Sequence, residues 1–223
     1  MITVMGLIQT AVELSDQSFS TYEADIRRAS GTQAQGAVFN RVIDRSQKGI
    51  DYARSTTELD AIAQFFFPDV SASMTAATLG SFSLSMGLPG PLVADMQSIL
   101  CLQNTVIEPP KTGGGLKRMS ILRKRPEITA EEFQRQWFGL HAVLVPRLPG
   151  IQGYRQNLVI DGPRDPEGNM LADGMVELWF EDGPSIERAF QSGPGHSLMM
   201  HAQEFIAEIS TFLVEPHRIH GIA

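Results

Sequence analysis

Residues 60–69 of the chain, DAIAQFFFPD, recur in altered form as residues 173–182, DGMVELWFED. Every position is identical or a like-for-like exchange, except that Glu181 stands opposite Pro68. Two shorter matches flank them in the same order: MGLIQ (5–9) with MSILR (119–123), and VIEP (106–109) with LVEP (213–216). Chance explains three ordered matches poorly, so the sequence predicts a tandem duplication.

The boundary between the two copies is marked by composition. Residues 109–115 read PPKTGGG, in which prolines stop a strand and glycines allow free turning. We therefore expect a first unit over residues 1–110, a linker over 111–115 and a second unit over 116–223.

The second unit shows alternating strand and helix signals. A strand is expected at 117–123. A helix follows it, with Thr129 as N-cap and Glu132 closing a capping box, and ends at about Val145 before Pro146. Further strands are expected at 151–160, 175–180 and 211–215, with helices at 185–191 and 197–209. The apolar residues at helical spacing in the first helix are predicted to be buried: Phe133, Trp137, Leu140 and Leu144.

The first unit repeats this order. A helix capped by Ser15 is expected over 15–29, strands near 37–44 and 61–67, and a broken helical stretch over 71–97. The order β-α-β-β-α-β is the ferredoxin-like plan, whose antiparallel sheet has helices on one face and needs a cover on the other. We expect an α+β fold in which the sheets of the two units pack face to face as a barrel-like pseudo-dimer, with a small-ligand site between sheet and helices.

The amino-acid composition narrows the range of possible functions. Hydrophobic residues make up 43% of the chain, enough to bury a core, and the net charge of −7 disfavours binding to nucleic acid. The single cysteine, Cys101, lies in an apolar run and is expected to be a buried, inert thiol. With no signal peptide or membrane span evident, a cytoplasmic protein is the default. One basic run is interpreted as a solvated strand end, with an anion site as the alternative: Lys117, Arg118, Arg123, Lys124 and Arg125.

The second unit also carries a family resemblance. Its Phe133-x3-Trp137-x3-His141 pattern, followed by Pro149-Gly150 and Tyr154, resembles the EthD family of the dimeric α/β barrel superfamily. Further residues carry the resemblance across nearly the whole unit: MSILRKRP (119–126), Glu131-Glu132, Leu148, Gln156-Asn157 and 173–180. Family members usually pair as homodimers, so the resemblance implies the same pairing within one chain. Further association of such chains stays open.

The resemblance does not fix a function. EthD-like proteins include members of unknown role in ether-degradation gene sets. Their relatives include cofactor-free isomerases of muconolactone type, and dehydratases or cyclases of aromatic polyketides. Some distant relatives hold haem on a histidine.

The candidate site lies in the second unit, where all five histidines are found. His141 lies about 80° of helix rotation from Phe133, at the edge of the buried stripe. Histidine is the natural general base near neutral pH. If the resemblance carries over, His141 abstracts a proton next to a carbonyl and Tyr154 donates a hydrogen bond to the enolate. Opposite His141, Trp137 and Tyr154, the first unit has Arg27, Glu23 and Asn40, so it is expected to be scaffold.

Each site residue also has a structural interpretation. His141 and Tyr154 could simply be packed core residues with satisfied polar atoms. Substrate contacts are expected from Trp137, Arg123, Arg155 and His201, although surface charge is the alternative for both arginines. Several other residues are interpreted as structural: Asp173-Gly174 as a strand-entry turn, Trp179 and Phe180 as core packing, and His217 and His220 as an exposed tail.

Three functions remain open. The first is a cofactor-independent lyase or isomerase, acting on a small cyclic or aromatic oxygenated metabolite through His141. The second is a non-catalytic ligand-binding or accessory protein of a catabolic pathway. The third is haem binding. We expect no cofactor, and no metal site, because His196 and His201 are five residues apart whereas ligand pairs on a helix favour shorter spacings.

Overall fold

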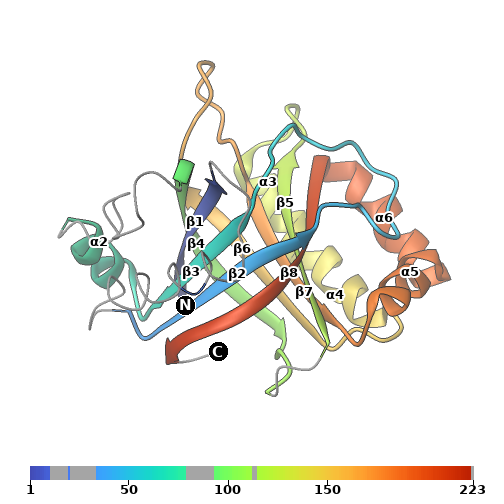
Figure 1. Cartoon of the computed structure of the whole chain (residues 1–223). Coiled ribbons are helices and arrows are strands. Elements are labelled where there is room, and N and C mark those ends of the chain that lie inside the picture. The colour runs from blue at the N-terminus through green and yellow to red at the C-terminus, as the bar shows by residue number, and fades with distance from the viewer. Residues whose placement is uncertain (11–19, 21–33, 79–92, 112–114, 222–223) are drawn as a thin grey trace.

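The computed structural model describes residues 1–10, 20, 34–78, 93–111 and 115–221. The strands of these residues form one closed barrel in the order β1-β3-β2-β8-β5-β7-β6-β4 (Figure 1). The first half contributes β1 (Ile2–Thr10), β2 (Gly36–Asp44), β3 (Ala61–Phe67) and β4 (Val93–Ile107). The second half contributes β5 (Leu116–Lys124), β6 (Gly153–Asp161), β7 (Gly174–Phe180) and β8 (Ile206–Gly221).

Each half has the antiparallel strand order of the ferredoxin-like plan, and the two sheets join at both edges. β2 pairs with β8, and β4 pairs with β6. The expected barrel is therefore formed by edge-to-edge hydrogen bonding in addition to packing of the inner faces. Closure leaves no strand edge unpaired, which removes the main liability of an open sheet.

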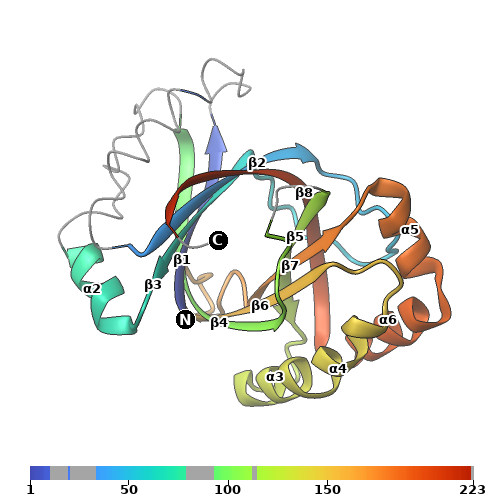
Figure 2. The same ribbon diagram turned by 90° about the horizontal axis from the view of Figure 1, so that it is seen from below.

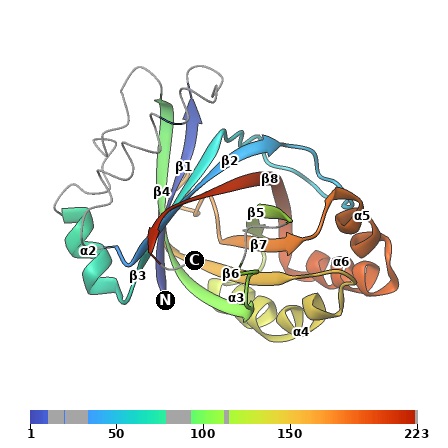
Figure 3. The same ribbon diagram turned by 60° about the horizontal axis from the view of Figure 1, so that its bottom comes forward.

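The helices lie outside the barrel (Figures 2 and 3). α2 (Val70–Thr78) lies on the side of the first half. The second half is covered by α3 (Ala130–Gln136), α4 (Ala142–Leu144), α5 (Gly183–Gln191) and α6 (Gly193–Phe205). None of the described helices has the length and hydrophobicity needed to cross a bilayer. The helix expected over 15–29 falls outside the described residues.

Two expected helix ends are wrong. Residues from Val93 belong to β4 rather than to a helix reaching 97, and α6 ends at Phe205 rather than at 209. Ile206 already pairs with Lys124 of β5, and Gly221 pairs with Gly36 of β2. The last strand is longer than the expected 211–215 because it pairs with both halves, and such pairing overrides a helical periodicity in a short apolar run.

The repeated aspartates stabilise equivalent strand entries. The Asp60 carboxylate accepts a hydrogen bond from the backbone N–H of Thr10 at 2.7 Å, and the Asp173 carboxylate accepts one from Lys124 at 2.8 Å. Each bond ties the entry of the third strand of a half to the end of its first strand. The strand-entry interpretation of Asp173 is confirmed.

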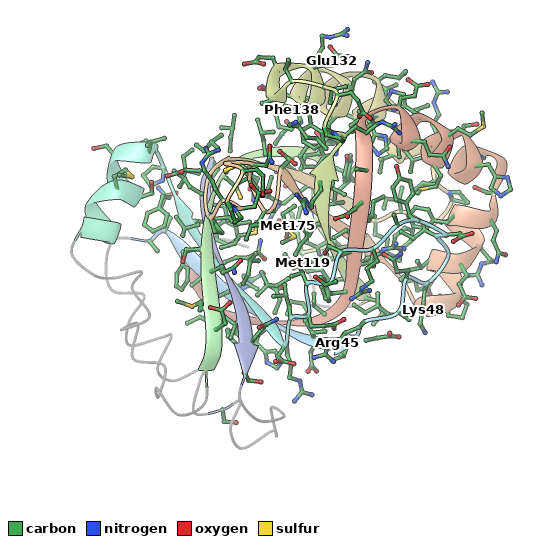
Figure 4. All side chains as sticks on the ribbon, turned by 90° about the horizontal axis from the view of Figure 1, so that it is seen from above. Arg45, Lys48, Met119, Glu132, Phe138 and Met175 are labelled. Carbon is green, nitrogen blue, oxygen red and sulfur yellow. The ribbon has the colours of Figure 1, made fainter. Side chains whose placement is uncertain are left out.

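Apolar side chains fill the middle of the barrel. Met119 and Met175, labelled in Figure 4, pack there with Met5, Phe212 and Cys101. Cys101 is fully buried, as expected, and burial raises the pKa of its thiol well above the ordinary value. Separate apolar clusters pack the outer face of each sheet against its own helices.

A buried polar network lies next to this apolar layer. The Lys117 ammonium is 2.7 Å from a Glu177 carboxylate oxygen and donates a hydrogen bond to Gln64 at 2.8 Å. Burial by itself raises the pKa of Glu177, but the charges of Lys117 and Arg155 outweigh it, so the net pKa is below the ordinary value. Lys117 is 3% exposed and Arg118 1%. The interpretation of these two residues as a solvated strand end is wrong.

The network has matching parts in the two halves. The Asn40 amide donates to the Ile62 carbonyl and to Gln64, both at 2.9 Å. The Asn157 amide donates to the Met175 carbonyl at 3.1 Å and to Glu177 at 2.9 Å. Asn40 therefore corresponds to Asn157.

The strand register also corrects an expected equivalence. Tyr154 pairs with Leu178, and in the first half Ala37 pairs with Phe65, the counterpart of Leu178. The counterpart of Tyr154 is therefore Ala37 and not Asn40. With alanine at this position, the first half lacks the tyrosine hydroxyl.

Replacing Lys117 by Met tests the network. This change leaves the buried Glu177 carboxylate without its closest cation, so the free energy of unfolding should fall by about 3 kcal/mol or more. Urea denaturation measures the loss. The double variant Lys117→Met/Glu177→Gln should regain most of it. Equal losses in the single and double variants would contradict this account.

Candidate active site

A small cavity lies between the sheet of the second half and its helices. Its volume is about 50 Å³, and its polar lining comes from Arg118, Ser120, His141 and Tyr154. The rest of the lining is apolar, with contributions from β5, β7, β8, α5, α6, the turn after α4 and the segment between β2 and β3. We call this space the sheet–helix cavity.

A π-helical turn brings His141 to this cavity. The turn spans Trp137–His141 and contains non-helical backbone at Gly139 (φ −87°, ψ −106°). His141 and Trp137 are buried at 8% and 0% exposure, whereas Leu140 is 54% exposed. The expected burial of Leu140 is wrong, because the kink at Gly139 shifts the helical phase and places His141 on the inner face.

His141 is part of a four-residue hydrogen-bond relay. Its Nδ1 lies 3.2 Å from Nδ1 of His201, and Nε2 of His201 lies 3.2 Å from the Gln136 side-chain oxygen. The Gln136 amide nitrogen donates to the Glu132 carboxylate at 2.8 Å. Thr129 caps this helix as expected, accepting from the Glu132 N–H. The Glu132 carboxylate, however, bonds to Arg135 and Gln136.

When both rings are uncharged, the relay sets the tautomers of the two histidines. The Glu132 carboxylate only accepts, so the Gln136 nitrogen faces it and the Gln136 oxygen accepts from Nε2–H of His201. Nδ1 of His201 is then an acceptor, and Nδ1–H of His141 donates to it. Nε2 of His141 consequently carries the free lone pair, which is the form a general base requires.

Burial keeps His141 uncharged. Burial, with a smaller contribution from His201, lowers the pKa of His141 from its ordinary value to about 3. The ring is therefore uncharged throughout the neutral range. A nearby negative charge would raise this pKa again, because it stabilises the imidazolium.

Tyr154 and Trp137 form the other side of the site. Both are fully buried, and neither the Tyr154 hydroxyl nor the Trp137 indole N–H has a well-aligned partner among the described residues. Burial raises the pKa of Tyr154 above its ordinary value, although Gln156 and Trp137 partly oppose it. Tyr154 is therefore a neutral hydrogen-bond donor. Gly174 leaves room for the indole, since a Cβ there would lie 2.5 Å from a Trp137 ring carbon.

Arg118 is a buried cation that the sequence analysis did not place in the site. Its guanidinium donates to the Lys48 carbonyl at 2.9 Å and to the Thr211 hydroxyl at 3.2 Å, and lies over the Phe190 ring. No carboxylate pairs with it among the described residues, and its Nε has no partner. Burial lowers the pKa of Arg118 to about 9, so the charge persists at neutral pH.

The first half covers this cavity of the second half. The segment between β2 and β3, which carries Lys48 (Figure 4), lies against β8. Ile50 lines the cavity, and the Tyr52 hydroxyl donates to the Ile206 carbonyl at 2.6 Å. The site therefore includes residues from both halves.

Of the four residues predicted to contact a substrate, two lie at or next to the sheet–helix cavity and two lie outside it. His201 joins His141, and Trp137 lies behind Tyr154. Arg155 and Arg123 lie elsewhere, near opposite ends of the barrel. Arg123 is within 4 Å of the carboxylates of Asp165 and Glu208.

The structure also changes the interpretation of His217, expected in an exposed tail, and of Trp179, expected in the core. His217 lies in β8 within 3.2 Å of the Glu215 carboxylate and is not a free tail residue. His220 belongs to the same strand, but its side chain lies outside the described part. Phe180 is core, as expected, whereas Trp179 is half-buried on the inner face of the barrel.

Haem does not fit the sheet–helix cavity. His201 has no nitrogen free to bind iron, because its Nδ1 faces His141 and its Nε2 bonds to Gln136. A volume of about 50 Å³ is also far below the roughly 300 Å³ at which ordinary ligand pockets begin. We derive no step through haem.

Sequence comparison finds one family match, and it lies within the second half. Residues 125–208 of the 223 match the family model described as EthD domain. The match includes the relay and Tyr154, and ends before most of β8. Among curated proteins, none matches the chain.

Solved structures share the fold over the whole chain. An anthrone oxidase-like protein has a TM-score of 0.64 at 10% identity, covering 100% of this chain and 96% of that chain. Chlorite dismutase from Candidatus Nitrospira defluvii has a TM-score of 0.53 at 8% identity, covering 96% and 90%. An EthD family protein from Bacillus halodurans covers 46% of this chain and 96% of its own, at 20% identity and a TM-score of 0.35. At these identities the likeness to the anthrone oxidase-like protein and to chlorite dismutase shows the fold alone.

The packing of Trp137 against Gly174 predicts a cost for Gly174→Ala. The new methyl group would overlap the Trp137 ring, so the free energy of unfolding should fall by about 1–3 kcal/mol. Gly183→Ala is the matched control, since a Cβ there has no neighbour within 4 Å. Denaturation midpoints compare the two variants. Equal stability would show that the indole is not held in this position.

The buried His141 predicts a pH dependence of stability. Unfolded histidine binds a proton below its ordinary pKa of 6.5, whereas folded His141 does so only at about 3. The unfolded state binds more protons between these values, so stability falls as pH drops below 6.5. From pH 7.5 to 5, the wild type should lose about 2 kcal/mol more than His141→Asn. Urea titrations with the same pH dependence for both proteins would refute the assignment.

Proposed function

We propose that this protein is a cofactor-independent isomerase or lyase acting on a small cyclic or aromatic oxygenated metabolite. The relay of Glu132, Gln136, His201 and His141 carries the proposal, because it leaves a neutral imidazole lone pair at a cavity. The buried Arg118 and the Tyr154 hydroxyl support it, since both favour negative charge on a bound oxygen.

The chemistry follows from these groups. Nε2 of His141 takes a proton from the carbon next to a carbonyl, and the electron pair moves onto the carbonyl oxygen. Arg118 and Tyr154 stabilise this enolate. As the negative charge develops, the pKa of His141 rises, so the imidazolium can return the proton to a different carbon in an isomerase. In a lyase, the enolate instead expels a leaving group, which takes the proton.

Substrate entry requires movement of the cover. A cavity of about 50 Å³ holds only about one or two water molecules. Ile50 and Met199 are half-buried side chains of its lining, from the first half and from α6. Their outward movement is the simplest way to admit a ring.

The two halves also support a structural proposal. We infer that they are copies of one unit, paired within the chain as a pseudo-dimer, and that only the second copy kept the catalytic groups. Matching strand orders and the matching roles of Asn40 and Asn157 support the duplication.

The test uses a β,γ-unsaturated butenolide, whose conversion to the conjugated isomer follows the proposed proton transfer. In D2O, the enzyme should speed this isomerisation and place deuterium at the new position, as followed by NMR. His141→Asn should lower the rate by about a hundredfold or more. The control is His196→Asn. It changes an exposed histidine of α6, the helix that carries His201, and should leave the rate unchanged.

A non-catalytic binding role is the second candidate. The small volume and strongly lowered pKa of His141 favour it, because both describe a closed site rather than a base poised near neutral pH. Lactone binding without turnover above the buffer rate would establish this alternative and exclude the isomerase.

A further inference from the structure

A much larger cavity opens at one end of the barrel. Its volume is about 750 Å³, and it lies where β5 begins and β7 ends. We call it the barrel mouth. Lys117 and Arg155 line it, whereas their neighbours Arg118 and Tyr154 line the sheet–helix cavity. Since successive residues of a strand face opposite sides, the two cavities lie on opposite faces of one sheet.

The inner end of the barrel mouth holds two cations and one carboxylate. The Lys117 ammonium is fully engaged by Glu177, Gln64 and Asn40. Arg155 is only 8% exposed, yet its guanidinium makes no hydrogen bond, and no ion pair within 4 Å, with any of the described residues, and its buried Nε has no partner among them. Burying a cation without a partner is costly. The site is therefore suited to one further negative charge.

The rim adds positive charge. Arg41, Lys111 and Arg218 lie around the opening. Glu215 is the rim carboxylate, and it is within 3.2 Å of both Arg41 and His217. This local excess of cations stands in a chain of net charge −7, so it attracts anions to this end of the molecule.

The walls are apolar and partly aromatic. Trp179, Phe66, Val38 and Val214 line the space, and the Trp179 ring lies 5.7 Å from the Arg155 guanidinium carbon. An apolar wall beside a buried cation suits a molecule with a flat hydrophobic body and one acidic end. A volume of about 750 Å³ lies within the range of roughly 300–1,000 Å³ of small-molecule pockets.

We propose that the barrel mouth is a binding site for an aromatic carboxylate, whose carboxylate pairs with Arg155 and whose ring packs beside Trp179. This site is separate from the sheet–helix cavity, and it stands whether or not the catalytic proposal holds.

The two tryptophans give each cavity its own reporter. Trp179 lines the barrel mouth, and Trp137 lies behind Tyr154 at the sheet–helix cavity. Benzoate is titrated into the 15N-labelled full chain in a buffer without other carboxylates or phosphate, and the two indole N–H signals are followed. Trp179→Phe assigns them by removing one signal.

The expected result is a saturable shift of the Trp179 signal, with an apparent Kd of roughly 1 mM or lower. Benzamide, which has the same ring without the charge, should bind far more weakly. Arg155→Met should weaken benzoate binding by about tenfold or more, and Arg155→Lys should restore part of it. Arg188→Met, on the exposed face of α5, is the charge-matched control and should bind benzoate as the wild type does.

Three results would overturn the proposal. The first is the absence of any saturable Trp179 shift with benzoate in the millimolar range. The second is equal binding by wild type, Arg155→Met and Arg155→Lys when all three give well-dispersed spectra. The third is a shift of Trp137 that His141→Asn abolishes, which would assign the benzoate to the sheet–helix cavity.

Discussion

The hydrogen bonds between β2 and β8 and between β4 and β6 are the constraint on which the rest of the structure depends. They close two four-stranded sheets into one barrel, so the inner face of the sheets is removed from water except at the open barrel mouth. Polar groups on that face must then find partners inside, which the network around Lys117 and Glu177 provides. The same closure brings the segment between β2 and β3 against β8, where Ile50 completes a cavity of the other half.

The sheet of the second half is covered on both faces, by the barrel interior and by helices. Neighbouring residues therefore have unrelated surroundings. On β5, Lys117 belongs to the inner network and Arg118 to the sheet–helix cavity. On β6, Arg155 faces the barrel mouth and Tyr154 the cavity. One strand pair thus supplies a buried cation to each face.

The sequence predicted the order of strands and helices along the chain and the barrel-like fold, because the two similar stretches, residues 60–69 and 173–182, contain β3 and β7. It also brought together His141, Tyr154 and His201. The sequence analysis missed Arg118, which looked like part of a solvated basic run. The sequence does not show that both faces of this sheet are covered, one by the barrel interior and the other by helices, and Arg118 is buried for that reason. Gln136 and Glu132 looked like ordinary helix and capping residues. Helical periodicity could not predict the irregular turn over Trp137–His141. The kink at Gly139 exchanges the positions expected for Leu140 and His141, and periodicity assumes a regular helix.

The contact between Gln64 and Glu177 has a consequence for symmetry. These residues occupy equivalent positions of the repeated stretch, and they meet at 3.1 Å. In a homodimer of the second half, this position would bring Glu177 against its own copy, placing two carboxylates together at the two-fold axis. Because the two halves of this chain differ in sequence, an amide faces the acid here and a single lysine neutralises it. One chain with two unlike halves thereby contains an asymmetric interior that no symmetric assembly of identical subunits could contain.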